Sequence, residues 1–165
     1  MPDSSLVAEK LRSAVLRRSF RKDFPSAVRG EGVYVWDADG NRYLDFSGSA
    51  AVNLIGHGVS AISAAIAEQV AQLEFVHTSQ FTTPVAENYA RELLEFAGDA
   101  FRCGAVYFTS GGSESVETAL KLARQYQVEI GQTKRYQVLS RRQSYHGSTL
   151  GALAVSGNKK RREIY

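Results

Sequence analysis

The sequence is poor in residues that form covalent or metal cross-links. Cys103 is the single cysteine among 165 residues, so an internal disulfide framework is excluded. The three histidines, His57, His77 and His146, lie far apart with no cysteine or second histidine beside them. A zinc site draws on about four such ligands at short spacing. We therefore expect no metal centre and assign the histidines to ordinary hydrogen bonds.

Long apolar runs are also missing. No stretch approaches the roughly 18 consecutive apolar residues of a membrane-spanning helix. The chain begins MPDSS, without the basic and then apolar segments of a secretory signal. We expect a cytoplasmic protein with no membrane partner.

A strong excess of one charge is absent too, because 20 basic residues face 17 acidic ones, for a formal net charge of +3. The basic residues cluster only at residues 17–18, 141–142 and 159–162, and no aromatic residues interleave with them. Nucleic-acid surfaces combine both features. We expect these clusters to be solvated faces and expect no nucleic-acid partner.

What is present is a balance typical of globular proteins, with 44% hydrophobic and 22% charged residues. Residues 5–18 have apolar side chains at helical spacing, which predicts a first helix. Residues 33–46 hold two β-rich runs around Asp39-Gly40, a pair that tolerates the positive φ of a hairpin turn. Ser60 is expected to cap a second helix.

The later part of the chain alternates strand and helix patterns. A helix is predicted to begin at Thr83, where a threonine precedes a proline, and to end near Gly98. Residues 105–108 and 136–139 are rich in β-formers and flank a predicted helix over about 114–130. This order predicts a βαβ unit with a parallel pair of strands and a right-handed crossover.

A glycine pair lies where the first of these strands meets the helix. Gly111 and Gly112, followed by Ser113, allow exposed amides to turn toward a ligand, and the helix dipole there favours an anion. A tight structural connection is the alternative interpretation. A P-loop and a dinucleotide-binding motif are excluded, because neither Gly-Lys-Ser/Thr nor Gly-x-Gly-x-x-Gly is present there.

Four separated motifs resemble those of class III (ω-type) pyridoxal-phosphate (PLP) aminotransferases. Their order and spacing agree with that family from about residue 28 to 157. The match to S-G-x-E-A-x-E-x-A-x-K-x-A-R is the most extensive, and Ser115 replaces the family's usual alanine there. The motifs are GVYVWDADGNRYLDF over residues 32–46, NLIGHG over 53–58, SGGSESVETALKLAR over 110–124 and YHGST over 145–149.

The resemblance implies a cofactor, PLP, and roles for five residues. Gly111, Gly112 and Ser113 would form the phosphate cup, with amides and a hydroxyl directed to the phosphate. Tyr145 would stack on the pyridine ring, with a buried core tyrosine as the alternative. His146 would bind or support the same loop.

The resemblance also indicates what is missing. The aldimine lysine of this family lies well downstream of these motifs, in longer chains. Lys121 falls inside the helix beyond the cup, and we reject it; Lys10, Lys22, Lys134, Lys159 and Lys160 lack the matching context. No catalytic residue is therefore assigned within this chain, and we expect the chain alone to be inactive.

The implied fold is α/β, fold type I, with a mainly parallel sheet in a large domain and a smaller α/β domain, incomplete in this chain. We assign residues 1–78 to the N-terminal part of the small domain with its linking helix. Residues 79–165 are assigned to the first part of the PLP-binding large domain. The implied reaction moves an amino group from an amine or amino acid to an oxo acid or aldehyde, in a homodimer.

Three alternatives stay open from the residues alone. A PLP-dependent aminomutase, racemase or decarboxylase of the same family shares these motifs. A truncated, non-catalytic product would serve as an interaction fragment. A generic nucleotide-binding α/β protein is a more distant possibility. The amino donor and acceptor are not specified by the sequence.

Overall fold

The computed structural model describes residues 14–165 except 18 and 20. Its internal contacts divide the chain into two units, residues 1–81 and 82–165. The assignment of residues 1–78 and 79–165 to a small and a large domain remains a prediction. The helix predicted over 5–18 falls mostly outside the described residues, and residues 14–17, which are described, are not helical.

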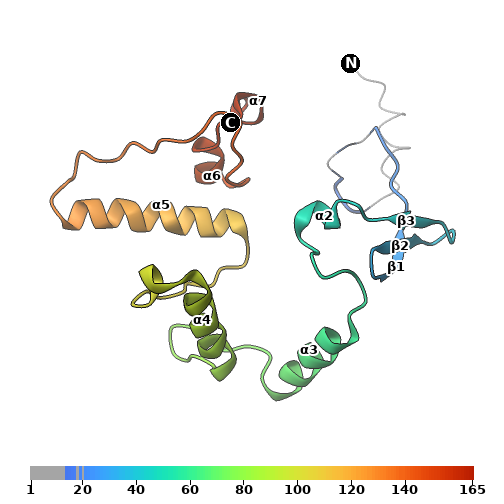
Figure 1. Cartoon of the computed structure of the whole chain (residues 1–165). Coiled ribbons are helices and arrows are strands. Elements are labelled where there is room, and N and C mark those ends of the chain that lie inside the picture. The colour runs from blue at the N-terminus through green and yellow to red at the C-terminus, as the bar shows by residue number, and fades with distance from the viewer. Residues whose placement is uncertain (1–13, 18, 20) are drawn as a thin grey trace. The chain divides into compact units, whose positions relative to one another are not determined.

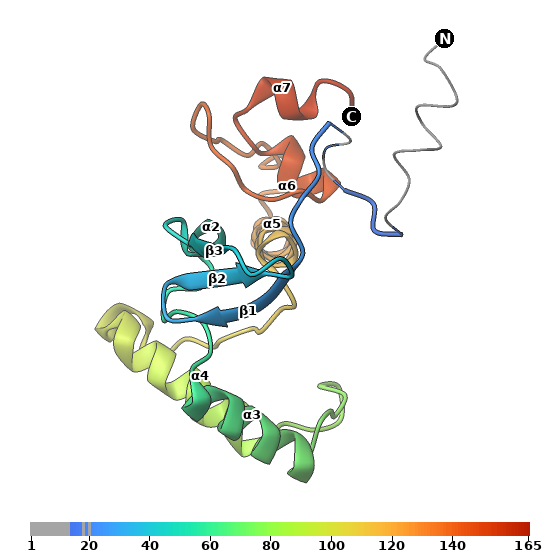
Figure 2. The same ribbon diagram turned by 90° about the vertical axis from the view of Figure 1, so that its right-hand side faces the viewer.

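The first unit contains a three-stranded antiparallel sheet in the order β1-β2-β3 (Figure 2). β2 (Tyr34–Asp37) and β3 (Arg42–Leu44) form the predicted hairpin, with Val35 opposite Tyr43. β1 (Ala27–Glu31), which we did not predict, pairs with the other edge of β2. The turn contains Gly40 at φ 83°, as the Asp-Gly pair indicated.

Asp37 fixes the hairpin turn. Its buried carboxylate accepts hydrogen bonds from the amide of Asp39 (3.0 Å), the amide of Asn41 (2.8 Å) and the hydroxyl of Tyr43 (2.6 Å). The hydroxyl of Tyr43 and the side chain of Asn41 lower the pKa of Asp37. These bonds satisfy a buried carboxylate, whose desolvation would otherwise be costly.

A left-handed turn follows the sheet at α2 (Gly48–Ala51). Three residues that are not glycine, Ser49, Ala50 and Ala51, have φ of 50°, 63° and 63°. Such conformations each cost roughly 1–2 kcal/mol. The carboxylate of Asp45 stabilises the turn by accepting from the Ser49 amide (3.0 Å) and hydroxyl (2.8 Å), and it lies 3.1 Å from His57 Nε2.

Three longer helices match the sequence expectations closely. α3 (Ser60–Gln72) begins one residue earlier than expected, because Val59 is the N-cap and Ser60 is already helical. α4 (Pro84–Ala97) has the predicted cap, with Thr83 Oγ1 accepting from the Ala86 amide at 3.2 Å, and ends at Gly98 with φ 89°. α5 (Gly112–Glu129) is the long helix after the glycine pair.

Shorter elements complete the second unit. A 3₁₀ turn, η1 (Asp99–Phe101), packs against α4. α6 (Leu150–Ala154) packs against both α5 and α7 (Lys159–Arg162), and Figure 1 shows α6 and α7 close together near the C-terminus. All four basic residues of α7 are exposed, as expected for a solvated face.

The predicted parallel pair of strands was wrong for this structure. Residues 105–108 and 136–139 lie outside strands, and no ladder joins them. Tyr107 and Leu139 are 77% and 96% exposed. A strand exists only with a partner, and consecutive strands are neighbours in only about two thirds of cases. The β-forming residues in these segments indicated an extended backbone, but they did not indicate which strand would pair with it.

Burial is concentrated in one place in the second unit. Among the described residues, Ala152 and Leu153 of α6 are the buried apolar side chains, and Ser156 beside them is 1% exposed. Gly147, on the preceding loop, is buried as well. Larger apolar side chains on α3 and α4, such as Ile66 and Phe96, are exposed. None of the described helices is long and apolar enough to cross a membrane.

Candidate functional site

The glycine pair forms the open start of α5. Gly111 is the N-cap, with extended backbone (φ −170°, ψ 166°), and no side chain caps the helix. The first turn of any helix leaves amides without an intrahelical partner. In an 18-residue helix these amides and the helix dipole together favour an anionic ligand.

Hydroxyl groups hold the segment that leads into α5. Thr109 Oγ1 and Ser115 Oγ both donate to the carbonyl oxygen of Gly111 at 3.1 Å, and the two hydroxyl oxygens are 2.5 Å apart. Ser115 is the residue that departs from the family motif. The Ser115 hydroxyl joins Gly111 to the first turn of α5. Serine in place of the family's alanine is therefore compatible with this turn.

Space for a ligand is present at Gly112. A Cβ built on Gly112 would meet no atom within 4 Å, and its φ is not in the left-handed region. A Cβ on Gly111 would instead lie 2.7 Å from a carboxylate oxygen of Glu114. The chain itself thus leaves the Gly112 side of the turn open, whereas Gly111 is closed off by a flexible side chain.

The structure brings the two predicted parts of the site together. The amide of Ser148 donates to Ser113 Oγ at 2.9 Å, across 35 residues of sequence. Gly147, with φ 139°, lies so close to α5 that a Cβ there would be 2.7 Å from Ser113 Oγ and 3.0 Å from Ser113 Cα. The loop 145–149 therefore lies directly against the start of α5.

Tyr145 and His146 differ in their surroundings. Tyr145 is 61% exposed, and the guanidinium carbon of Arg161 lies 5.1 Å from the centroid of its ring. His146 is half-buried, and its amide donates to Ser156 Oγ at 3.1 Å. Tyr145 is thus exposed within this chain, and its stacking role stays a prediction. The backbone amide of His146 makes the bond to Ser156, and it supports the loop.

Two residues that we did not predict hold this loop. Glu117 Oε1 accepts from the amide of Ala152 at 3.1 Å. The hydroxyl of Thr149 and the amides of Ala152 and Gly151 lower the pKa of Glu117. Ser156 Oγ donates to the carbonyl of Ala152 at 2.8 Å. Glu117 was detectable in principle, because it lies four residues after Ser113 and therefore on the same face of α5.

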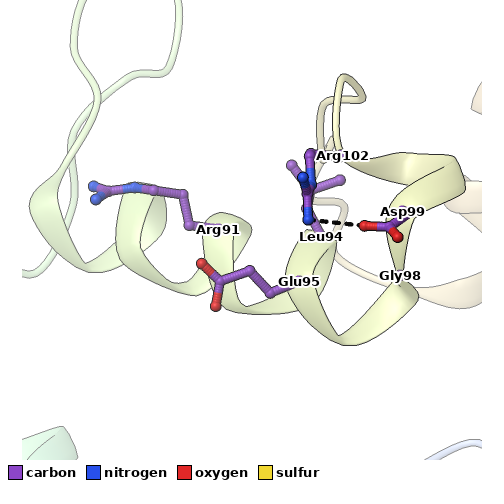
Figure 3. Close-up of a pocket in the computed structure, with 6 residues that line it drawn as sticks. All are labelled: Arg91, Leu94, Glu95, Gly98, Asp99 and Arg102. Atoms are coloured by element: carbon purple, nitrogen blue, oxygen red, sulfur yellow. Dashed lines mark ion pairs between the residues drawn. The ribbon is translucent and has the colours of Figure 1, made fainter.

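The pocket found in the second unit lies elsewhere. It is a hollow of about 560 Å³ lined by α4 and η1, and none of the predicted site residues lines it (Figure 3). Its arginines are engaged, because Arg102 pairs with Asp99 at 2.8 Å and Arg91 Nη2 donates to Asn88 at 2.9 Å. The described residues contain no cluster of metal-ligating side chains.

Comparison with known proteins identifies the class. The model of the family "Aminotransferase class-III" matches residues 18–164. The chain belongs to this family. It is 40% identical over 153 residues to aminotransferase YodT of Bacillus subtilis, covering 92% of this chain and 34% of the relative.

Solved structures agree with the family. A thermostable (S)-enantioselective ω-transaminase from Thermomicrobium roseum superposes with a TM-score of 0.87 at 36% identity, covering 98% of this chain and 37% of that one. An amine transaminase from an uncultivated Pseudomonas species, in a PLP-bound form, gives a TM-score of 0.78 at 35% identity, covering 92% and 34%. The chain thus has the fold of part of a fold type I transaminase and spans about a third of these relatives.

Proposed function

We propose that this chain provides the cofactor phosphate site of a PLP-dependent class III aminotransferase. The whole protein would transfer an amino group from an amine or amino acid to an oxo acid or aldehyde. The observation that carries this proposal is the contact between the start of α5 and the loop 145–149, within a chain whose family match covers residues 18–164. Two motifs that lie 35 residues apart meet at one anion-favouring helix start.

The residues present fit the phosphate group of PLP. The N-terminus of α5 has no side-chain cap, and the position of Gly112 leaves open space beside its amides. Ser113 Oγ accepts from Ser148, so its own proton remains available to a phosphate oxygen. Gly112 and Ser113 would hold the phosphate, with Gly111 allowing the chain to turn into the helix.

Tyr145 and His146 have supporting roles in this proposal. The exposed ring of Tyr145 would stack on the pyridine ring, which restrains it in one orientation. The amide bond between His146 and Ser156 would keep the loop in place. When bound, PLP supplies an electron sink for the amino-transfer chemistry. In the whole protein we also propose a homodimer in the cytoplasm, following the resemblance to the family.

The test uses the full-length protein with an amine donor and an oxo-acid acceptor. We expect stoichiometric appearance of a carbonyl product from the donor and an amino product from the acceptor, dependent on PLP. Nitrogen-15 in the donor should appear in the acceptor. Label retained in the original carbon skeleton would indicate an aminomutase, loss of carbon dioxide a decarboxylase, and inversion alone a racemase. Any of these three results would contradict the proposed reaction.

A further inference from the structure

One face of α5 is joined to the candidate cofactor loop at two successive turns. Ser113 and Glu117 are four residues apart and so lie on the same face of the helix. Ser113 Oγ accepts from the amide of Ser148 at 2.9 Å, and Glu117 Oε1 accepts from the amide of Ala152 at 3.1 Å. Both partners are also four residues apart, so the two bonds hold α5 and residues 148–152 in a single register.

Glu117 serves as the cap that α6 lacks. Thr149 is the N-cap of α6, and it makes no side-chain capping bond of its own. The Thr149 hydroxyl and the amides of Ala152 and Gly151 lower the pKa of Glu117, so they stabilise its charged form. A carboxylate at a helix start satisfies unpaired amides there and interacts favourably with the dipole.

The Glu117 carboxylate occupies the space that a side chain at position 151 would enter. A Cβ built on Gly151 would clash with the carboxylate oxygens of Glu117, although the φ of Gly151 is not left-handed. A side chain at position 151 would therefore displace the Glu117 carboxylate from the start of α6. The close approach indicates that the carboxylate belongs to the packed arrangement of α5 on α6.

The contacts continue from α6 back to the loop. Ser156 Oγ donates to the carbonyl of Ala152 and accepts from the amide of His146. Ala152 and Ser156 are among the few fully buried described residues. A chain of hydrogen bonds thus runs from Glu117 through α6 to His146, beside Tyr145.

We propose that Glu117 is a positioning residue for the PLP site. Its carboxylate bonds to the start of α6, and by fixing α6 it holds the backbone of residues 146–148 in place before the cofactor arrives. Preorganisation of this kind raises affinity because less ordering is left to be done on binding. The inference rests on the proposed function, since PLP is the ligand that the loop would receive.

The experiment compares Glu117→Ala, Glu117→Gln and a matched control, Glu129→Gln, in the full-length protein. Glu129 is the last residue of α5, and its carboxylate accepts from Gln125 Nε2 at 2.7 Å. Glutamine at 117 keeps one acceptor oxygen for the Ala152 amide, but it loses the charge and replaces the second oxygen with a donor NH2 group. Thermal unfolding of each variant establishes that it is folded.

Two readouts are needed. In the cofactor-free protein, Glu117→Ala should accelerate hydrogen exchange at the amides of Ser148 and Ala152, whereas Glu129→Gln should not. In titrations of the apo protein with PLP, Glu117→Ala should weaken binding by about tenfold or more, the loss of one bond to a charged group. Glu117→Gln should recover part of both effects. The circular dichroism of bound PLP should also change in Glu117→Ala.

The outcomes separate the two levels of the proposal. Unchanged exchange in Glu117→Ala would overturn the positioning role whatever PLP does. Faster exchange in Glu117→Ala together with wild-type PLP affinity would mean that Glu117 holds the loop without contributing to cofactor binding. This result would also overturn the inference. A wild-type protein that binds no PLP would overturn the proposed function itself, and the exchange data would still report whether Glu117 holds the loop.

Discussion

Substitution of Gly112 tests the phosphate cup with little interference from folding. A Cβ at this position meets no atom within 4 Å, and the backbone is not left-handed. Valine is also a better helix former than glycine. Gly112→Val should therefore fold normally, with a thermal midpoint equal to or slightly above that of the wild type. Any loss of PLP binding then reports on the ligand and not on the chain.

The expected loss follows from the bonds that valine would obstruct. The isopropyl group would occupy the space beside the first amides of α5, where phosphate oxygens approach to about 2.9 Å. Loss of two charge-assisted hydrogen bonds at about 1.5 kcal/mol each amounts to about 3 kcal/mol. PLP affinity should fall more than about 100-fold.

Ser113→Ala should cost less, although the structure adds a contribution to it. The hydroxyl would lose one bond to the phosphate, and the Ser148 amide would lose its acceptor at 2.9 Å. Since Ser148 is exposed, water replaces much of the second bond. The total loss of PLP binding free energy should be about 2 kcal/mol, which corresponds to about 30-fold weaker affinity.

Equilibrium titration of the apo variants with PLP measures both effects. We expect Gly112→Val to bind PLP more weakly than Ser113→Ala does, and both variants to bind it more weakly than the wild type. A Gly112→Val protein that binds PLP as tightly as wild type would refute the reasoning, because the glycine pair would then be a structural turn and the phosphate would bind elsewhere.

Further measurements test other parts of the account. Tyr145→Ala should weaken PLP retention by about 1 kcal/mol and Tyr145→Phe should be mild; identical, wild-type behaviour of both would exclude stacking. Borohydride reduction of the 165-residue chain with PLP should label several surface lysines substoichiometrically, and one stoichiometric label at Lys121 would contradict this. The same chain should self-associate through its exposed apolar faces, and a monodisperse monomer in gel filtration would contradict that. The lowered pKa of Asp45 should contribute stability that is present above its ordinary value of 3.8 and lost as pH falls through the folded value, so Asp45→Asn should flatten the acid limb of unfolding free energy against pH.

Local signals predicted the helices and the hairpin well because their causes are local. Thr83 caps α4 through its own side chain, three residues from the amide that it binds. Gly98 ends the same helix with a left-handed φ that glycine adopts without strain. Gly40 does the same for the hairpin. Each of these features is specified by a few adjacent residues.

Features that depend on distant partners were not predicted. The segment 105–108 has β-forming side chains, but a ladder needs a neighbour that propensity does not name. The left-handed turn at Ser49 and Ala50 was missed for a different reason: Asp45, which stabilises it, lies only four residues away, but neither position is a glycine. Sequence patterns indicate which backbone conformations a segment tolerates. A strained turn of this kind is stabilised by the hydrogen bonds around it.

The candidate site depends both on local motifs and on contacts between distant residues, so only part of it was predictable from the sequence. Gly112 and Tyr145 belong to motifs and could be proposed from the sequence, whereas the hydrogen bond between Ser113 and Ser148 could not. The buried residues of the second unit gather at α6, behind the loop that carries Tyr145, while the apolar faces of the longer helices stay exposed. The buried side chains of the second unit therefore hold the loop 145–149 against α5. A ligand that contacts both the loop and the start of α5 would bind to an arrangement that is already formed.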